Sequence, residues 1–172
     1  MAQELKGGPP AYPPSAVHMA RSAVSNQMHL SAMADQKASI LMGATFVVFT
    51  IAVGQPGARQ APLPLLILGG AAFVSAVLAV LAILPAVRYR KRAPLNLMFF
   101  GSFAELGEDE YIERLLAGMR SDESIYRIMA RDIYQNGVVL ARKKYRMLGW
   151  AYRIFLAGLT ASLAAFVVEA FF

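Results

Sequence analysis

The chain has 172 residues, of which 57% are hydrophobic and 16% charged, and its mean hydropathy is +0.46. This composition is typical of membrane proteins and argues against an ordinary water-soluble domain. The absence of cysteine excludes disulfides, thiolate metal sites and cysteine nucleophiles. The formal net charge of +6 would suit nucleic acid. However, the basic residues lie beside apolar runs, which favours lipid headgroups over nucleic acid as the partner.

The N-terminal part of the chain is polar to mildly amphipathic. Residues 1–14 contain the sequences GGPP and YPP, so we expect a disordered tail there. Four apolar residues then recur at helical spacing: Val17, Ala20, Val24 and Met28. They predict an amphipathic helix over residues 15–37.

Two long apolar runs follow. Residues 38–54 predict a first transmembrane helix that is slightly short, and Lys37 can snorkel outward at its beginning. Residues 64–87 belong to a longer run, Ala61–Val87, that holds no charged residue. A hydrocarbon core about 30 Å thick takes about 20 apolar helical residues, so this run predicts a second transmembrane helix. Residues 55–63 contain Pro and Gly and predict an external turn, so the two spans form a hairpin.

Residues 88–149 form a more polar helical segment. The sequence LNLMFFGSF, residues 95–103, is apolar but too short to span, so we expect it at the membrane interface or packed under the bundle. One helix begins after Gly107, with acidic residues in its first turn. A longer helix begins near Ser121 and meets no breaker before a third transmembrane helix at residues 150–171.

These elements predict an all-α integral membrane protein with three transmembrane helices. Two basic clusters lie between the second and third spans: Arg88, Arg90, Lys91 and Arg92, and then Arg142, Lys143, Lys144 and Arg146. The external turn carries Arg59 alone. The positive-inside rule therefore places residues 15–37 and 88–149 and the N-terminus in the cytoplasm and the C-terminus outside.

The two basic clusters allow two interpretations. The first is topology and headgroup contact, at about 1 kcal/mol per basic residue near an anionic surface. Arg88, Arg90, Lys91 and Arg92 are assigned to this role. The second is that both clusters bind a phosphate-bearing ligand. The sequence favours the first, because no glycine-rich phosphate loop accompanies the clusters.

Asp35 and Lys37 form a charged motif at the mouth of the first span. Because they are two residues apart on a helix, their side chains point to different sides and do not pair with each other. A charge at this position needs water or a partner, which makes Asp35 a functional candidate. Alternatively, both side chains reach headgroups and water.

No catalytic, cofactor or metal-binding constellation is evident in the sequence. His18 and His29 have no clustered acids or thiols around them, which argues against a metal site. Ser, His and Asp occur without a nucleophile motif. We therefore expect neither an enzyme nor a bound cofactor or metal.

Three stretches resemble the Pycsar transmembrane effector family. They are ADQKASILMGATFVVF at residues 34–49, RAPLNLMFFGSFAELGEDEY at residues 92–111 and RDIYQNGVVLARKKYRMLGWAYRIFLAGL at residues 131–159. The resemblance implies a bacterial antiphage role. A partner cyclase would make a cyclic pyrimidine nucleotide on infection, cUMP more than cCMP. The effector would then impair inner-membrane integrity, causing abortive infection.

If the nucleotide binds directly, the cytoplasmic helices must hold it. Arg142, Lys143 or Lys144 would then take the phosphate. Gln135 or Asn136 would take the pyrimidine edge, and Tyr134 would stack on the base. These residues are the candidate nucleotide contacts.

Killing would need homo-oligomers, because three spans cannot enclose a pore alone. Small residues of the second span would let helices approach closely: Gly69, Gly70, Ala71, Ala72, Ser75 and Ala76. The same residues would also suit packing within one monomer.

Two other functions compete with the effector hypothesis. A constitutive membrane scaffold would recruit a partner protein through its cytoplasmic helices, and its expression would not be toxic when the nucleotide is present. A small transporter subunit would need polar or charged residues at mid-depth of a span. Only Thr45, Thr50, Ser75 and Thr160 lie there, so the transporter is the least favoured.

Overall fold

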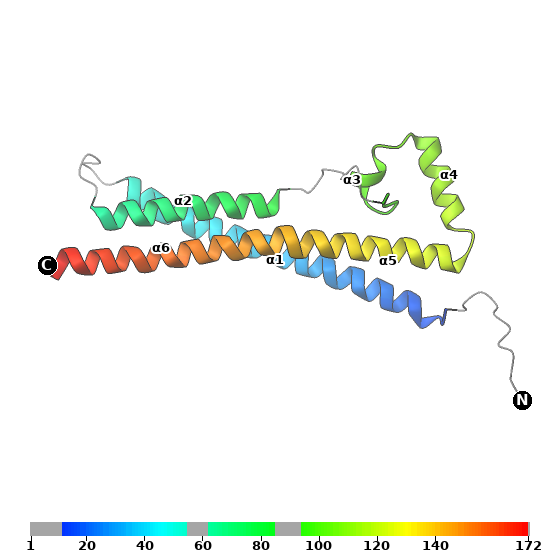
Figure 1. The fold of residues 1–172 in the computed structure, drawn as a ribbon, viewed down its shortest axis with the longest axis horizontal. Coiled ribbons are helices and arrows are strands. Elements are labelled where there is room, and N and C mark those ends of the chain that lie inside the picture. Colours follow the sequence, from blue (N-terminus) through cyan, green and yellow to red (C-terminus); the bar gives the residue numbers. More distant parts are fainter. Residues whose placement is uncertain (1–11, 55–61, 85–93, 172) are drawn as a thin grey trace, which may run out of the picture. The chain divides into compact units, whose positions relative to one another are not determined.

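The computed structural model describes residues 12–54, 62–84 and 94–171, and within them every regular element is a helix. The elements are α1 (Ser15–Val53), α2 (Leu63–Ile83), α3 (Phe100–Phe103), α4 (Glu108–Gly118), α5 (Asp122–Val139), the π-helix η2 (Leu140–Tyr145) and α6 (Arg146–Phe171) (Figure 1). Three helices are long and apolar enough to cross a membrane: Ser15–Val53, Leu63–Ile83 and Asp122–Phe171. The protein is therefore an all-α membrane protein, as the sequence predicts.

Local sequence signals account for several of the observed helix ends. Residues 15–53, which include the predicted amphipathic segment 15–37 and all but the last residue of the predicted span 38–54, form one unbroken helix, α1. Gly107 precedes α4, whose first turn holds the acids Glu108, Asp109 and Glu110. Helical structure continues from Asp122 to Phe171. Most of the predicted external turn and the basic cluster Arg88, Arg90, Lys91 and Arg92 lie outside the described residues.

The chain divides into two compact units. The first unit comprises Met1–Met28 and Ala86–Val138, and the second comprises His29–Pro85 and Val139–Phe172. Both units receive part of α1, and the helix from Asp122 to Phe171 also continues from one unit into the other.

The second unit packs α1, α2 and α6 around small side chains. Its core joins Ala34 and Ala38 of α1 to Ala79 and Ala82 of α2 and to Ala151 of α6. Large apolar side chains point outward instead: Phe46, Phe73 and Phe166 are 70%, 56% and 61% exposed. A water-soluble protein would bury such side chains. Small residues inside and large apolar residues outside are the pattern expected for helices in lipid.

Buried hydroxyls and glycines bring α2 and α6 close together. The Ser75 hydroxyl donates to the carbonyl of Ala151 at 2.8 Å, and the Ser162 hydroxyl donates to that of Pro64 at 2.8 Å. A Cβ atom on Gly158 would overlap the methyl group of Ala71. Part of the small-residue stripe on α2 therefore packs inside the monomer, although Gly70 faces open space.

The first unit combines the beginning of α1 with α4, α5 and the segment from Pro94 to Phe103. The Gln27 side-chain amide of α1 donates to the Ile133 carbonyl of α5 at 2.9 Å. The ring of Tyr12 packs against that of Tyr126, with the centroids 4.5 Å apart. Tyr12 belongs to the predicted tail 1–14, so ordered packing begins before the predicted boundary at Ser15.

Candidate functional site

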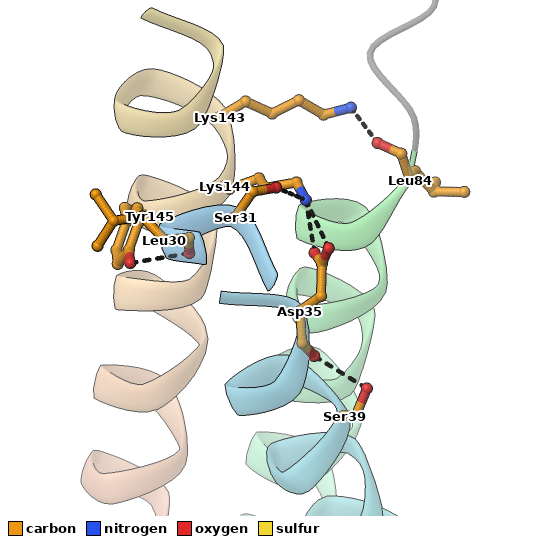
Figure 2. A network of polar contacts seen from close by, with 8 residues as sticks. All are labelled: Leu30, Ser31, Asp35, Ser39, Leu84, Lys143, Lys144 and Tyr145. Atoms are coloured by element: carbon orange, nitrogen blue, oxygen red, sulfur yellow. Dashed lines mark hydrogen bonds and ion pairs between the residues drawn. The ribbon is translucent and has the colours of Figure 1, made fainter. Parts of the chain in front are cut away.

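An ion pair joins α1 to η2 in the second unit. The Lys144 ammonium donates to both carboxylate oxygens of Asp35 and to the Ser31 hydroxyl, each at 2.7 Å (Figure 2). The Lys144 side chain is 19% exposed and that of Asp35 is 41% exposed. Each therefore serves as the other's counterion in a place where water reaches only one side. The Asp35 carboxylate thus has a partner within the protein. The sequence alone did not show whether Asp35 would have such a partner or would reach headgroups and water.

Further hydrogen bonds hold the helices around this ion pair. The Tyr145 hydroxyl donates to the Leu30 carbonyl at 3.2 Å, and the Lys143 ammonium donates to the Leu84 carbonyl at the end of α2 (Figure 2). The Tyr152 hydroxyl donates to the backbone carbonyl of Lys37 at 3.1 Å. The side chain of Lys37 is itself exposed. Basic and aromatic side chains of η2 and α6 thus fix the position of α1 at the mouth of its span.

The π-helix η2 lies at the centre of this contact region. It covers the sequence LARKKY, residues 140–145, and contains Lys143, Lys144 and Tyr145. A π-turn widens the helix locally, and such turns are frequent at functional sites. From η2, Lys144 and Tyr145 bind α1, while Lys143 binds the carbonyl at the end of α2. Helical periodicity in the sequence did not predict this feature.

A second polar network is buried in the first unit. Asp132 is 6% exposed and Asn96 is 1% exposed. One Asp132 carboxylate oxygen accepts hydrogen bonds from the side-chain amides of Asn96, at 3.0 Å, and Asn136, at 2.9 Å. The Asn96 backbone N–H donates to the Ser102 hydroxyl at 2.9 Å, and its side-chain oxygen accepts from the Met98 N–H at 3.0 Å. The network fastens the segment from Pro94 to Phe103 onto α5.

The candidate nucleotide contacts fall into both units. In the first unit, Tyr134 is 70% exposed, whereas the Gln135 side-chain amide donates to the Pro94 carbonyl at 2.9 Å. Asn136 is a member of the Asp132 network. In the second unit, Lys143 and Lys144 bind groups of the chain, and Arg142 is exposed. Four of the six residues therefore have internal hydrogen-bond partners already.

A solvent-open pocket of about 400 Å³ lies between α4 and α5. Three guanidinium groups line it, those of Arg114, Arg127 and Arg131, together with the Glu123 carboxylate. The Ser121 and Ser124 hydroxyls line it as well, and Leu97 and Ile128 add apolar surface. We call it the arginine pocket. The spacing of Arg127 and Arg131 places both on one helix face. Their proximity to Arg114 depends on the packing of α4 against α5, and the sequence analysis did not predict it.

The electrostatics of the arginine pocket favour an anion. The hydrogen bond that Arg127 donates to Glu123, and then the charge of that carboxylate, raise the pKa of the Arg127 guanidinium above its ordinary value. Among the described residues, no three His, Asp or Glu side chains gather closely enough to hold a metal ion. Guanidinium groups form charge-assisted hydrogen bonds with phosphate and carboxylate, so the three arginines make an anion the type of ligand that suits this pocket.

Two comparisons with known proteins match this chain. A family model described as "Pycsar effector protein domain" matches residues 18–169. The Pycsar effector protein PtPycTM of Propioniciclava tarda is 33% identical over 116 residues, which cover 63% of this chain and 55% of the relative. The matched region therefore spans little more than half of that relative's length. No solved structure matches the chain.

Proposed function

Because this chain belongs to the Pycsar effector family, we propose that it is an antiphage defence effector of the bacterial inner membrane. In this proposal a cognate pyrimidine cyclase makes cUMP, or less favourably cCMP, on infection. The nucleotide is the activating ligand, the effector impairs membrane integrity, and the infected cell dies before the phage spreads. The relative PtPycTM is a Pycsar effector protein by name, which supports the same role here.

One structural observation carries the proposal. A lipid-type bundle and a polar unit share two continuous helices, Ser15–Val53 and Asp122–Phe171. A ligand that changes the packing of the polar unit can therefore act on the spans through helices that belong to both. A ligand-gated membrane effector needs such coupling. Its ligand must also bind the active and the inactive state with different affinity, because only then does binding shift the protein from one state to the other.

The topology and assembly are also part of the proposal. The N-terminus and the first unit face the cytoplasm, where a cyclase product would accumulate, and the C-terminus faces outward. Membrane lipids surround the spans, and the basic residues at their ends contact anionic headgroups. Several copies assemble when activated, since three helices cannot enclose an aqueous path.

The protein acts without catalysis in this proposal. Its polar networks bind helices to one another. The alternative is a constitutive scaffold that recruits a partner protein through its cytoplasmic helices. The effector is favoured because the family match covers both the spans and the polar unit.

Dye release from liposomes separates the two functions. Purified protein is inserted into vesicles, and cUMP, cCMP, cAMP or buffer is added. Release with one pyrimidine nucleotide and not with cAMP supports the effector. Inserted protein that releases no dye with any nucleotide, and is not toxic in cells that also express a pyrimidine cyclase, supports the scaffold.

A further inference from the structure

We infer that the arginine pocket of the first unit binds the phosphodiester of the activating nucleotide. The identity of the ligand rests on the function proposed above, whereas the anion site rests on the geometry of the pocket. The site differs from the candidate contacts that sequence reasoning placed on Tyr134–Asn136 and Arg142–Lys144.

The charge of the pocket is the first argument. Three guanidinium groups and a single carboxylate line it. Each guanidinium carries five N–H donors in a planar fork, which matches two phosphate oxygens at once. Such charge-assisted pairs are about twice as strong as neutral hydrogen bonds. Arg114 and Arg127 already pair with Glu110 and Glu123, so the cluster has a surplus of one positive charge. A cyclic nucleotide carries one negative charge on its phosphodiester, which this surplus matches.

The guanidinium groups are held loosely enough to turn toward a ligand. Arg114 contacts Glu110 at 2.6 Å and Arg127 contacts Glu123 at 2.8 Å, each one helical turn apart. At least about half of each of these side chains is exposed. Such ion pairs on an exposed helix surface are weak, so a phosphate can compete for their N–H groups at little cost. Arg131 is anchored by one nitrogen to the Leu95 carbonyl at 3.1 Å.

The remainder of the pocket suits a nucleoside. Its volume of about 400 Å³ lies within the range of about 300–1,000 Å³ that small-molecule sites occupy. The Ser121 hydroxyl and the Glu123 carboxylate can accept hydrogen bonds from a ribose hydroxyl or from a pyrimidine N–H. Leu97 and Ile128 offer apolar contact to a base.

The basic tract on η2 is a poorer phosphate site. The Lys144 ammonium contacts Asp35 and Ser31, and the Lys143 ammonium contacts the Leu84 carbonyl. A phosphate there would have to compete with the Asp35 carboxylate and the Ser31 hydroxyl for a Lys144 side chain that is only 19% exposed. The arginine pocket requires no comparable loss.

The test is calorimetric titration of cUMP and cCMP into full-length protein in zwitterionic nanodiscs. The pocket variant is Arg127→Ala with Arg131→Ala. The matched control, Arg21→Ala with Arg120→Ala, removes the same charge from exposed positions of the first unit outside the pocket lining. A third variant, Arg142→Ala with Lys143→Ala, tests the basic tract. We expect about tenfold weaker binding or more for the pocket variant alone, because charge-assisted hydrogen bonds are lost.

Arg127→Lys guards against a folding defect. It preserves the charge and the helix while removing the fork geometry, so it should also weaken nucleotide binding. Circular dichroism and elution volume show whether each variant is folded.

Four results would overturn the inference. One is unchanged affinity in the pocket variant, and another is equal loss in the charge-matched control. The third is nucleotide binding that is lost when phosphatidylglycerol nanodiscs replace the zwitterionic ones, or when inorganic phosphate is added at the concentration of the nucleotide. Either loss would indicate a general phosphate or headgroup site. If no nucleotide binds the unmodified protein, the inference is also wrong. In that case, the proposed function is tested separately by asking whether the protein is toxic to cells that also express a pyrimidine cyclase.

Discussion

The Lys144 ammonium lies 2.7 Å from each carboxylate oxygen of Asp35, although 109 residues separate them in the chain. This pair connects the beginning of the apolar part of α1 with η2 at the start of the third span. Its half-buried position gives the two charges more influence on stability than an exposed pair would have.

Replacing Asp35 with Asn should therefore destabilise the second unit. The change leaves the Lys144 charge, which is only 19% exposed, without its counterion. We expect a loss of about 1–3 kcal/mol, between the values for exposed and fully buried pairs. Thermal unfolding in detergent measures it. Lys144→Met should cost less, because the Asp35 carboxylate is more exposed and can take up water.

The double variant Asp35→Asn with Lys144→Met provides the control for this pair. Removing both charges should restore most of the stability lost in Asp35→Asn, since no uncompensated charge remains. Simple addition of the two single losses would contradict a direct interaction between these side chains.

Gly158 should be intolerant of any larger side chain. A Cβ atom there would overlap the Ala71 methyl group of α2, which cannot rotate away. Gly158→Leu should therefore separate α2 from α6 and break the hydrogen bond from Ser162 to Pro64. We expect a loss of about 1–3 kcal/mol or more, as for other overpacked cores.

Gly70→Leu is the matched control on α2. Nothing lies within 4 Å of a Cβ atom at this position, so the folded monomer should accept it. If Gly70→Leu folds but loses dye-release activity, then this face serves assembly between copies. If Gly70→Leu unfolds the monomer, the open space beside Gly70 is contradicted.

Asp132 should be essential for the order of the first unit. Asp132→Ala would leave the side-chain amides of Asn96 and Asn136 without their shared acceptor in a buried place. Unsatisfied buried groups cost about 1–3 kcal/mol each. We expect faster proteolysis of the segment from Pro94 to Phe103 while the transmembrane bundle stays folded. Glu113→Ala, at an exposed position of α4, should leave proteolysis unchanged.

The proposed orientation can be tested by cysteine labelling, because the natural chain has no cysteine. A Glu113→Cys variant should react with a membrane-impermeant maleimide only after the cells are permeabilised. A Gly57→Cys variant, in the predicted external turn, should react in intact cells. The reverse pattern would show that the positive-inside argument assigns the wrong side.

The fold class and the three candidate spans could be predicted from the amino-acid sequence. A charge-free run as long as Ala61–Val87 predicts a transmembrane helix, because a helix satisfies the hydrogen bonds of its own backbone in lipid. The first turns of α4 and α5 could also be predicted, because acidic residues near a helix N-terminus are a local sequence signal for the beginning of a helix. The resemblance to the family was likewise carried by short stretches of sequence and was confirmed by the family match.

The pairing of distant polar groups could not be predicted from the sequence and became visible in the folded chain. Asp35 and Lys144 are 109 residues apart, and Asn96 and Asp132 are 36 apart, so neither periodicity nor local spacing contains these pairs. The same is true of the arginine pocket, where Arg114 of α4 joins two arginines of α5. The physical reason is that helix formation and membrane insertion depend on neighbouring residues and composition. Charge pairing and pocket formation depend instead on the packing of distant helices, which the linear pattern does not specify.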